Sequence, residues 1–235
     1  MTSHAHATEE TAVKTIGPDK ALARLARLDA CAVSDALDKL GLPGAALGLA
    51  ALAAPRRITG RAVTIDLVEA GPGVVASGRH LGTAAVDASG PGDVIVVAHY
   101  GRTHAAGWGG VLSAGAKRNA VAGVVVHGAC RDVDEARELD LPVYATAGVP
   151  VTARGRVLER AWNVPVDIAG VPVAPGDLVI ADASGVVFVP AAHTEQVLST
   201  AEAIAAKERA MVERVRAGHP MADVMSADYE NMLDR

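Results

Sequence analysis

The stretch Val121-Ala-Gly-Val-Val-Val-His-Gly-Ala-Cys-Arg-Asp132 decides how the rest of this chain is interpreted. The apolar run Val124–Val126 predicts a short buried strand, because it is too brief for a helix and β-branched side chains favour strands. Arg131 and Asp132 follow at the carboxyl end of that strand. Open α/β folds bind their ligands at this end of their strands.

Arg131 and Asp132 have two interpretations. An aspartate can hold a hard divalent cation through its oxygens, and an arginine can bind a carboxylate through two parallel hydrogen bonds. The alternative is structural: Asp132 would favour the amino-terminal end of a helix over residues 133–139, and Arg131 would be solvated. Taken alone, the pair favours the structural interpretation.

The preceding segment changes that balance. Gly107-Trp-Gly-Gly-Val-Leu-Ser113 leads into a small-residue helix that ends just before the strand. Together with Glu135, the spacing from Gly110 to Arg131-Asp132 forms the pattern G-x20-R-D-x2-E. This pattern resembles the signature of the RraA-like family, which takes its name from the regulator of ribonuclease activity A. The family includes the class II 4-hydroxy-4-methyl-2-oxoglutarate aldolases.

Further blocks extend the resemblance from about Leu28 to the carboxyl terminus. They occur in the family's order: Ser34-Asp-Ala-Leu37, Gly60-Arg-Ala-Val-Thr64, Pro91-Gly-Asp-Val-Ile-Val96 and Pro175-Gly-Asp-Leu-Val-Ile-Ala-Asp182. The resemblance implies an α/β protein with a compact β/β/α swivelling-domain-like RraA-like fold and flanking amino- and carboxyl-terminal helices. It also implies a homotrimer or a dimer of trimers, with active sites between subunits.

The resemblance also implies a site. Asp132 would hold Mg²⁺ or Mn²⁺, largely through waters, and Arg131 would bind the substrate carboxylate. The pyruvyl carboxylate would lie on backbone amides at the start of the glycine-led helix, at Gly109, Gly110, Val111 and Leu112. A helix amino terminus suits an anion, because its first N–H groups have no acceptor within the helix.

The implied reaction is cleavage of a 4-hydroxy-2-oxo acid or decarboxylation of oxaloacetate. Both form a pyruvate enolate, whose charge a metal ion stabilises. No Schiff-base lysine is needed, and Lys117 has the pattern of a solvated helix face. The alternative is a non-catalytic interaction protein, because the name-giving branch of the family binds a ribonuclease. That branch tends to lack the Asp after the Arg. A methyltransferase is disfavoured, because no Gly-rich nucleotide loop follows a strand.

Two departures from the family pattern concern acids. Many members carry an acid at the position of Gly110 and Asp at the positions of Ala98 and His127. His104 and His127, with His99 beside them, are therefore candidates for proton transfer. Each could equally be an ordinary loop or strand-end histidine. If the substrate carries a second carboxylate, the candidates to bind it are Arg102, Arg154 and Arg156. Each of them could instead be a solvated surface charge.

Length and composition predict one domain over residues 17–235, preceded by a flexible arm over residues 1–16. Half of the 235 residues are hydrophobic, so a sizeable core is available. The net charge of −5 argues against nucleic acid as a partner. Neither a membrane span nor a signal segment is recognisable, so a cytoplasmic protein is expected. Cys31 and Cys130 are expected to be buried thiols rather than a disulfide.

Along the chain, the pattern predicts helices, strands and loops without a clean βαβ alternation. Helices are expected over residues 22–28, 31–40 (beginning near Ser34-Asp35), 80–86, 114–119, 133–139 and 192–218. Strands are expected over residues 60–68, 94–97, 124–126 and 141–145, with β-hairpins over residues 162–190. Loops are expected over residues 44–54 and 98–106.

Overall fold

The computed structural model describes residues 18–225, so the predicted arm over residues 1–16 lies outside the described residues. The strands are β1 (Ala45–Ala46), β2 (Ala50–Ala53), β3 (Ile58–Glu69), β4 (Asp93–Trp108), β5 (Gly123–Cys130), β6 (Val143–Gly148), β7 (Val157–Trp162), β8 (Val166–Ile168), β9 (Val171–Val173), β10 (Leu178–Asp182) and β11 (Gly185–Val189). The helices are α1 (Pro18–Leu25), α2 (Ala30–Leu40), α3 (Thr83–Ala88), α4 (Gly110–Arg118), α5 (Val133–Glu138), α6 (Thr194–Arg216) and α7 (Met221–Val224), with a 3₁₀ turn at Ala191–His193.

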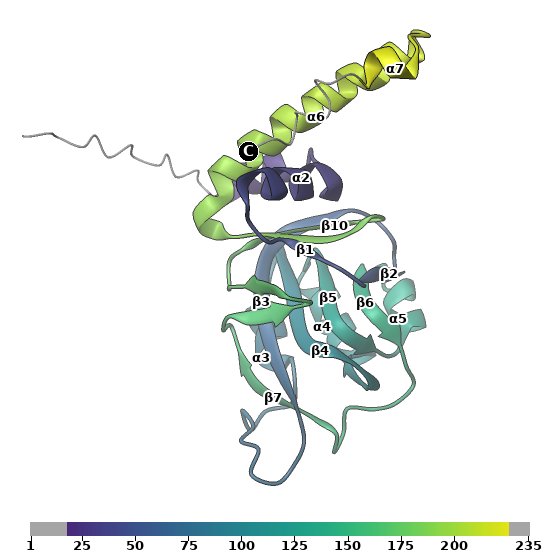
Figure 1. Ribbon diagram of the computed structural model, residues 1–235. Coiled ribbons are helices and arrows are strands. Elements are labelled where there is room, and N and C mark those ends of the chain that lie inside the picture. The colour runs from purple at the N-terminus through teal and green to yellow at the C-terminus, as the bar shows by residue number, and fades with distance from the viewer. Residues whose placement is uncertain (1–17, 226–235) are drawn as a thin grey trace, which may run out of the picture.

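A nine-stranded sheet forms the centre of the molecule (Figure 1). Its order is β1-β11-β10-β3-β4-β5-β6-β2, with β7 paired to the second half of β3. Strands β3, β4, β5 and β6 are parallel, and the other pairs are antiparallel. Strands β8 and β9 form a separate hairpin. The mixed α/β fold that the sequence predicts, a central sheet with flanking helices, is confirmed.

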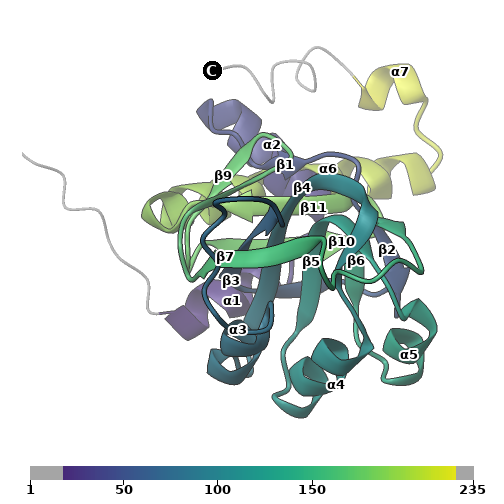
Figure 2. The ribbon, with the colours of Figure 1, turned by 90° about the horizontal axis from the view of Figure 1, so that it is seen from below.

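The parallel strands are joined by helices α3, α4 and α5, which lie together on one face of the sheet (Figure 2). Residues 58–148 are therefore a regular β-α-β-α-β-α-β run, and the expectation of no clean alternation is wrong. Helices α3 and α5 have six residues each. Helices were expected at both places, over residues 80–86 and 133–139. The pairing of the strands that they join was not recognised, because strand pairing is a contact between segments that are distant in the sequence.

Each layer has its own apolar core. The core under α3, α4 and α5 contains Ile95, Val124 and Leu141, and the opposite face of the sheet packs Val96 and Val125 against the β8–β9 hairpin. Helices α1, α2 and α6 pack on β10 and β11 around residues such as Leu37, Ile180 and Leu198. The central strands are rich in valine because parallel strands are buried on both faces.

Two predicted loops contain strands. Residues 44–54 hold β1 and β2, which pair with β11 and β6. Residues 98–106 belong to β4, whose register to β5 shifts three times between Ala98 and Trp108. Bulged segments carry polar residues that interrupt the apolar pattern of a strand, so they resemble loops in sequence.

Helix boundaries also differ from expectation in one place. Helix α2 begins at Ala30, and Asp29 caps it by accepting the Ala32 N–H at 2.8 Å. The predicted span of residues 31–40 therefore agrees with α2 to within one residue, but a capping role for Ser34 and Asp35 is wrong, because both residues lie within the helix. The predicted long carboxyl-terminal helix is confirmed as α6.

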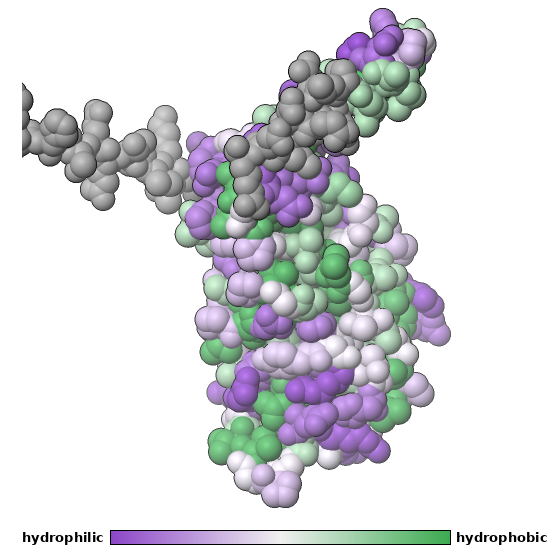
Figure 3. Space-filling model, in the orientation of Figure 1, coloured by the Kyte–Doolittle hydropathy of each residue, from purple (hydrophilic) through white to green (hydrophobic). Residues whose placement is uncertain are grey.

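Both cysteines are free thiols, as predicted, but only Cys130 is buried, whereas Cys31 is exposed. On the face shown in Figure 3, hydrophilic and hydrophobic residues are interspersed over the sheet. Within residues 18–225, none of the helices has the length and apolar character that crossing a bilayer requires.

Candidate active site

The turn between β5 and α5 holds Asp132 in the left-handed region, with φ 56° and ψ 42°. Aspartate tolerates this conformation better than most residues. Although Asp132 is in the N-cap position of α5, its side chain makes no capping hydrogen bond to that helix. The Asp132 side chain therefore does not cap α5, which argues against the purely structural interpretation of this residue.

The Asp132 carboxylate instead faces the amino terminus of α4. Its Oδ2 accepts the Gly110 N–H at 2.9 Å, and its Oδ1 accepts Arg131 Nε at 3.0 Å. Partial burial alone would raise the pKa of Asp132, but the Gly110 amide and the Arg131 guanidinium together hold that pKa below its ordinary value. The group is therefore a carboxylate at neutral pH.

The start of α4 is fixed by a buried side-chain contact and by a glycine. Trp108 Nε1 donates to Ser113 Oγ at 2.9 Å, and that hydroxyl donates to the Gly109 carbonyl at 3.1 Å. A Cβ at Gly109 would lie 3.0 Å from Asp132 Oδ2. Glycine at this position lets the carboxylate approach the helix end.

A second carboxylate, that of Glu135, approaches the same point. A Cβ at Gly110 would lie 3.4 Å from both Asp132 Oδ2 and Glu135 Oε2. Glu135 was identified in the sequence only as part of a motif. The sequence signal for a role in the site was the spacing of Glu135 from Asp132. Residues three apart at the start of a helix lie on the same face.

A cavity of about 420 Å³ opens beside this pair. It is lined by residues 131–135 of the turn and α5 and by residues 148–150 after β6. The second segment was missed in the sequence, and the Val149 N–H fixes it to β5 by donating to the Cys130 carbonyl at 2.8 Å. The first-turn amides of α4, at Val111 and Leu112, have no acceptor within the helix.

The oxygens at this site suit a hard divalent ion. Magnesium keeps several of its waters and is bound by one or two carboxylates, which Asp132 and Glu135 supply. Each carboxylate oxygen of Asp132 has accepted one hydrogen bond and retains a further lone pair. Within residues 18–225 no cluster of three or more His, Cys, Asp or Glu residues is arranged to hold a metal. The residues present fit an ion held largely through waters.

The family model described as "RraA-like: Aldolase/RraA" matches residues 30–188. This chain belongs to the RraA-like family. It is 31% identical to the protein DlpA of Legionella pneumophila over 84% of this chain, although it spans only 32% of that protein. It is 35% identical to the "Putative 4-hydroxy-4-methyl-2-oxoglutarate aldolase" of Halalkalibacterium halodurans, over 79% of this chain and 85% of that protein.

A solved structure agrees with the family assignment. Streptomyces coelicolor RraAS2, titled an unusual member of the RNase ES inhibitor RraA protein family, superposes with a TM-score of 0.74. Its identity is 28%, and the match covers 86% of this chain and 98% of that one. Further relatives, among them one from Deinococcus radiodurans, are also named putative 4-hydroxy-4-methyl-2-oxoglutarate aldolases.

His127 of this RraA-like chain points toward the β8–β9 hairpin. Its Nδ1 accepts the Ala169 N–H at 3.0 Å, so the neutral ring carries its proton on Nε2. Burial lowers the pKa of His127, against a smaller opposing effect of Asp167. The lone pair that a general base needs is therefore already engaged, and a role for His127 in proton transfer stays a prediction.

The other two histidines lie on β4. His104 is half exposed, with Nε2 3.4 Å from Glu69 Oε1. His99 is fully buried, and its Nε2 donates to the Ala105 carbonyl at 2.8 Å. Burial lowers the pKa of His99. These contacts hold the bulged part of β4, and the predicted catalytic role of His104 is untested.

The bulge of β4 is held by a second polar cluster that the sequence did not predict. Tyr100 is left-handed at φ 52°, and its hydroxyl donates to Asp66 Oδ1 at 2.9 Å. Arg160 Nε donates to Asp66 Oδ2 at 2.7 Å. The Arg102 guanidinium lies over the Tyr100 ring, 5.3 Å from its centre.

The remaining basic candidates lie outside the cavity. Arg102 donates to the Leu67 carbonyl, and Arg156 donates to carbonyls of its own loop, including that of Arg154. None of the three candidate arginines lines the cavity beside Asp132. Lys117 donates to the Asp140 carbonyl at the exposed surface, as its solvated-face pattern predicts.

Proposed function

We propose that this chain is a divalent-metal-dependent carbon–carbon lyase that acts on 2-oxo acids. One observation carries the proposal: the Asp132 carboxylate is held against the first amide of α4, with Arg131 beside it, at the mouth of a cavity. A carboxylate suited to a cation therefore lies next to N–H groups suited to an anion, which supports the proposal. The aldolase names of relatives such as that of Halalkalibacterium halodurans support the same reaction class.

In this proposal Asp132 would hold Mg²⁺ or Mn²⁺, largely through waters. Arg131 and the α4 amides of Gly109, Val111 and Leu112 bind the carboxylate of the substrate, because the Gly110 N–H already donates to Asp132. The ion, when bound, would supply positive charge that stabilises the oxygen of the pyruvate enolate. The residues of the chain orient the 2-oxo acid so that the bond to be broken faces the cavity.

Retro-aldol cleavage then needs one proton acceptor. The 4-hydroxyl loses its proton, the C3–C4 bond breaks, and its electron pair passes to the C2 carbonyl. The 4-hydroxyl carbon leaves as an aldehyde or ketone, and C3 takes a proton to give pyruvate. In oxaloacetate the same bond breaks with loss of CO₂. Glu135 is the candidate for the proton transfer, because its Oε2 and Asp132 Oδ2 both lie 3.4 Å from the Cβ position at Gly110, and His104 and His127 are the alternatives.

Pyruvate release from oxaloacetate and from 4-hydroxy-4-methyl-2-oxoglutarate, with and without Mg²⁺, tests the proposal. We expect release from at least one substrate that stops when the metal is chelated. Equal release in the presence of a chelator, or none from either substrate, would overturn the assignment. Light scattering of the same preparation tests the proposed homotrimer or dimer of trimers.

A regulatory function is the second candidate, because RraAS2 is titled a member of an RNase ES inhibitor family. Inhibition of a ribonuclease of that type by this chain, retained in an Asp132→Asn variant, would favour it. Asp132 distinguishes the lyase from the ribonuclease inhibitor. A lyase of the proposed kind needs a cation beside the helix end that binds the substrate anion, whereas an inhibitor does not.

A further inference from the structure

We infer that the projecting end of α6, together with α7, is a docking surface for the same surface of a second copy of this chain, with the two α6 helices antiparallel. The inference concerns assembly and does not depend on the proposed reaction. It rests on an apolar groove, on the charged side chains at the two ends of that groove and on their spacing along α6.

The carboxyl-terminal half of α6 extends beyond the body of the molecule (Figure 1). All the buried residues of this helix lie in its first half, between Val197 and Ala205, where it packs on α1 and α2. Helix α7 is held to the projecting half, because Arg214 Nη2 donates to the Asp223 carbonyl at 3.2 Å. Residues 206–225 therefore form one structural unit, which we call the arm.

The arm carries an apolar groove of about 510 Å³. Its apolar lining consists of Met211, Val212, Val215, Met221, Val224 and Met225. Four of these side chains are between 39% and 57% exposed, and hydrophobic residues gather at the projecting end in Figure 3. Monomeric soluble proteins seldom expose large contiguous apolar patches, and such patches mark contact sites.

The charged residues at the ends of the groove indicate its occupant. Glu208 and Arg216 both line the groove, and each is four residues from Val212 along α6. Residues four apart lie on the same face of a helix. A second α6 that runs antiparallel, with the two-fold axis beside Val212, therefore places Glu208 opposite Arg216 of the partner subunit. The same symmetry makes the reciprocal pair, so the surface is complementary to itself, as a two-fold contact requires.

Both charged residues have capacity for this contact. Within residues 18–225, Glu208 forms no ion pair, and burial together with the carboxylates of Asp35 and Asp29 raises its pKa. Arg216 donates from Nη1 to Glu213 at the exposed surface, which leaves its other N–H groups for a second carboxylate. An arginine from a partner subunit therefore supplies the opposite charge that Glu208 lacks in the single chain.

The first test is the molar mass of the full chain by light scattering. Val212→Glu places two carboxylates against each other at the two-fold axis, so the mass should fall to one half, whatever other contacts join the subunits. Ala210→Glu adds the same charge on the opposite face of α6 and should leave the mass unchanged. An unchanged mass for Val212→Glu would overturn the inference, and so would a fall to one third, which indicates a three-fold contact.

A charge exchange tests the antiparallel direction. Glu208→Arg places like charges opposite each other and should raise the Kd of the two-fold contact about tenfold. Adding Arg216→Glu restores opposite charges and should recover most of the loss. If the double variant associates no better than Glu208→Arg alone, the proposed pairing is wrong.

Cross-linking keeps the test independent of any loss of folding. Val212→Cys, in a Cys31→Ser background that removes the exposed native thiol, should form a disulfide with its counterpart under mild oxidation, because residues at a two-fold axis lie close together. Ala210→Cys in the same background should not. If residues 226–235 of the same chain or an unrelated protein occupy the groove, Val212→Cys forms no covalent dimer, and that result overturns the inference.

Discussion

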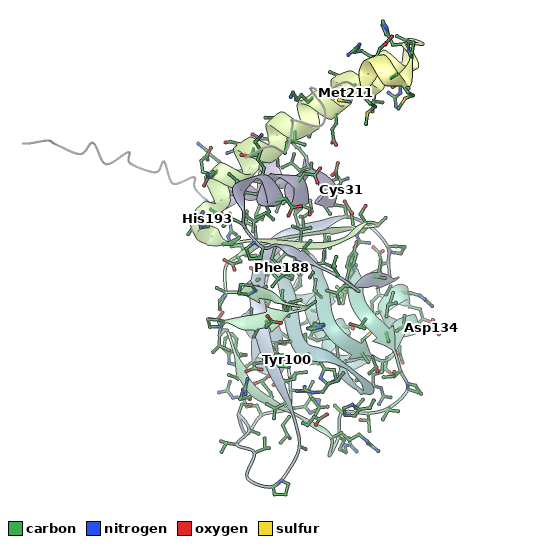
Figure 4. All side chains as sticks on the ribbon, in the orientation of Figure 1. Cys31, Tyr100, Asp134, Phe188, His193 and Met211 are labelled. Atoms are coloured by element: carbon green, nitrogen blue, oxygen red, sulfur yellow. The ribbon has the colours of Figure 1, made fainter. Side chains whose placement is uncertain are left out.

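The Asp132 turn and the Tyr100 bulge are alike in composition and different in use. The turn follows the parallel strand β5 and the bulge lies within the parallel strand β4. Each holds a non-glycine residue at positive φ, 56° for Asp132 and 52° for Tyr100. Each also pairs an aspartate with an arginine. Figure 4 shows Tyr100 in front of the sheet and Asp134, two residues after Asp132, at the outer edge of the molecule.

The two regions differ in what their carboxylates have left to bind. At the bulge, Tyr100 and Arg160 take both oxygens of Asp66, which is buried. At the turn, a backbone amide and one Arg131 nitrogen hold Asp132 beside a cavity. Charged residues and an unusual backbone therefore do not by themselves mark a site. A functional site is indicated instead by polar atoms that can still accept or donate hydrogen bonds and that lie beside a cavity.

The largest effect is expected from Asp132→Asn. The amide keeps the shape of the side chain but loses the charge that binds the cation, so metal-dependent pyruvate release should fall about a thousandfold. Asp87→Asn, at an exposed side chain of α3 outside the cavity lining, is the control and should stay near wild type. Circular dichroism checks that both variants are folded. Full activity of Asp132→Asn in the presence of a chelator would contradict the metal assignment.

Arg131→Lys is expected to have the next largest effect. An ammonium group cannot reproduce the planar fork of arginine, and losing a charge-assisted pair costs about 2 kcal/mol or more, so kcat/KM should fall roughly thirtyfold. Arg102→Lys, at the bulge, should change kcat/KM little. Similar kcat/KM values for Arg131→Lys and Arg102→Lys would show that the Asp132 turn is no more important for activity than the Tyr100 bulge.

Tyr100→Phe should affect stability rather than activity. It removes one hydrogen bond to a buried carboxylate, which is worth about 1 to 2 kcal/mol, so Tm should fall by about 2 to 8 °C. Pyruvate release at 25 °C should be unchanged. A large loss of activity with unchanged Tm would make the bulge part of the active site.

The smallest effects on turnover are expected from His104→Gln and His127→Gln. If a histidine moved the proton, one of them would slow the reaction about a hundredfold and remove a limb of the pH profile. We expect less than about a threefold change, because neither histidine lines the cavity beside Asp132 and Nδ1 of His127 is engaged. A hundredfold loss would restore the histidine hypothesis.

His127 should instead appear in the pH dependence of stability. Its pKa is lowered in the folded state, mainly by burial. The unfolded state therefore binds the proton more readily, and the free energy of unfolding should decrease as pH falls below about 6.5. The His127→Gln variant should show a shallower decrease in chemical denaturation. An identical pH dependence in both proteins would contradict this assignment.

The sequence by itself determined the strand that ends in Arg131 and Asp132, the glycine-led helix before it, and the long helix α6. These features are local, because they rest on β-branched runs, helix periodicity and motif spacing. The resemblance to RraA-like proteins rests on the same spacing. It predicted the family and the mixed α/β fold.

Only the tertiary structure decided which partner Asp132 takes. Its carboxylate binds the Gly110 amide of α4 and makes no capping bond to α5, the helix that follows it in the chain. Local sequence predicts a cap for the next helix, and a contact across 22 residues depends on how α4 packs beside β5. The approach of Glu135 and the cavity wall at residues 148–150 have the same origin, since parallel strands bring distant segments to one edge of the sheet.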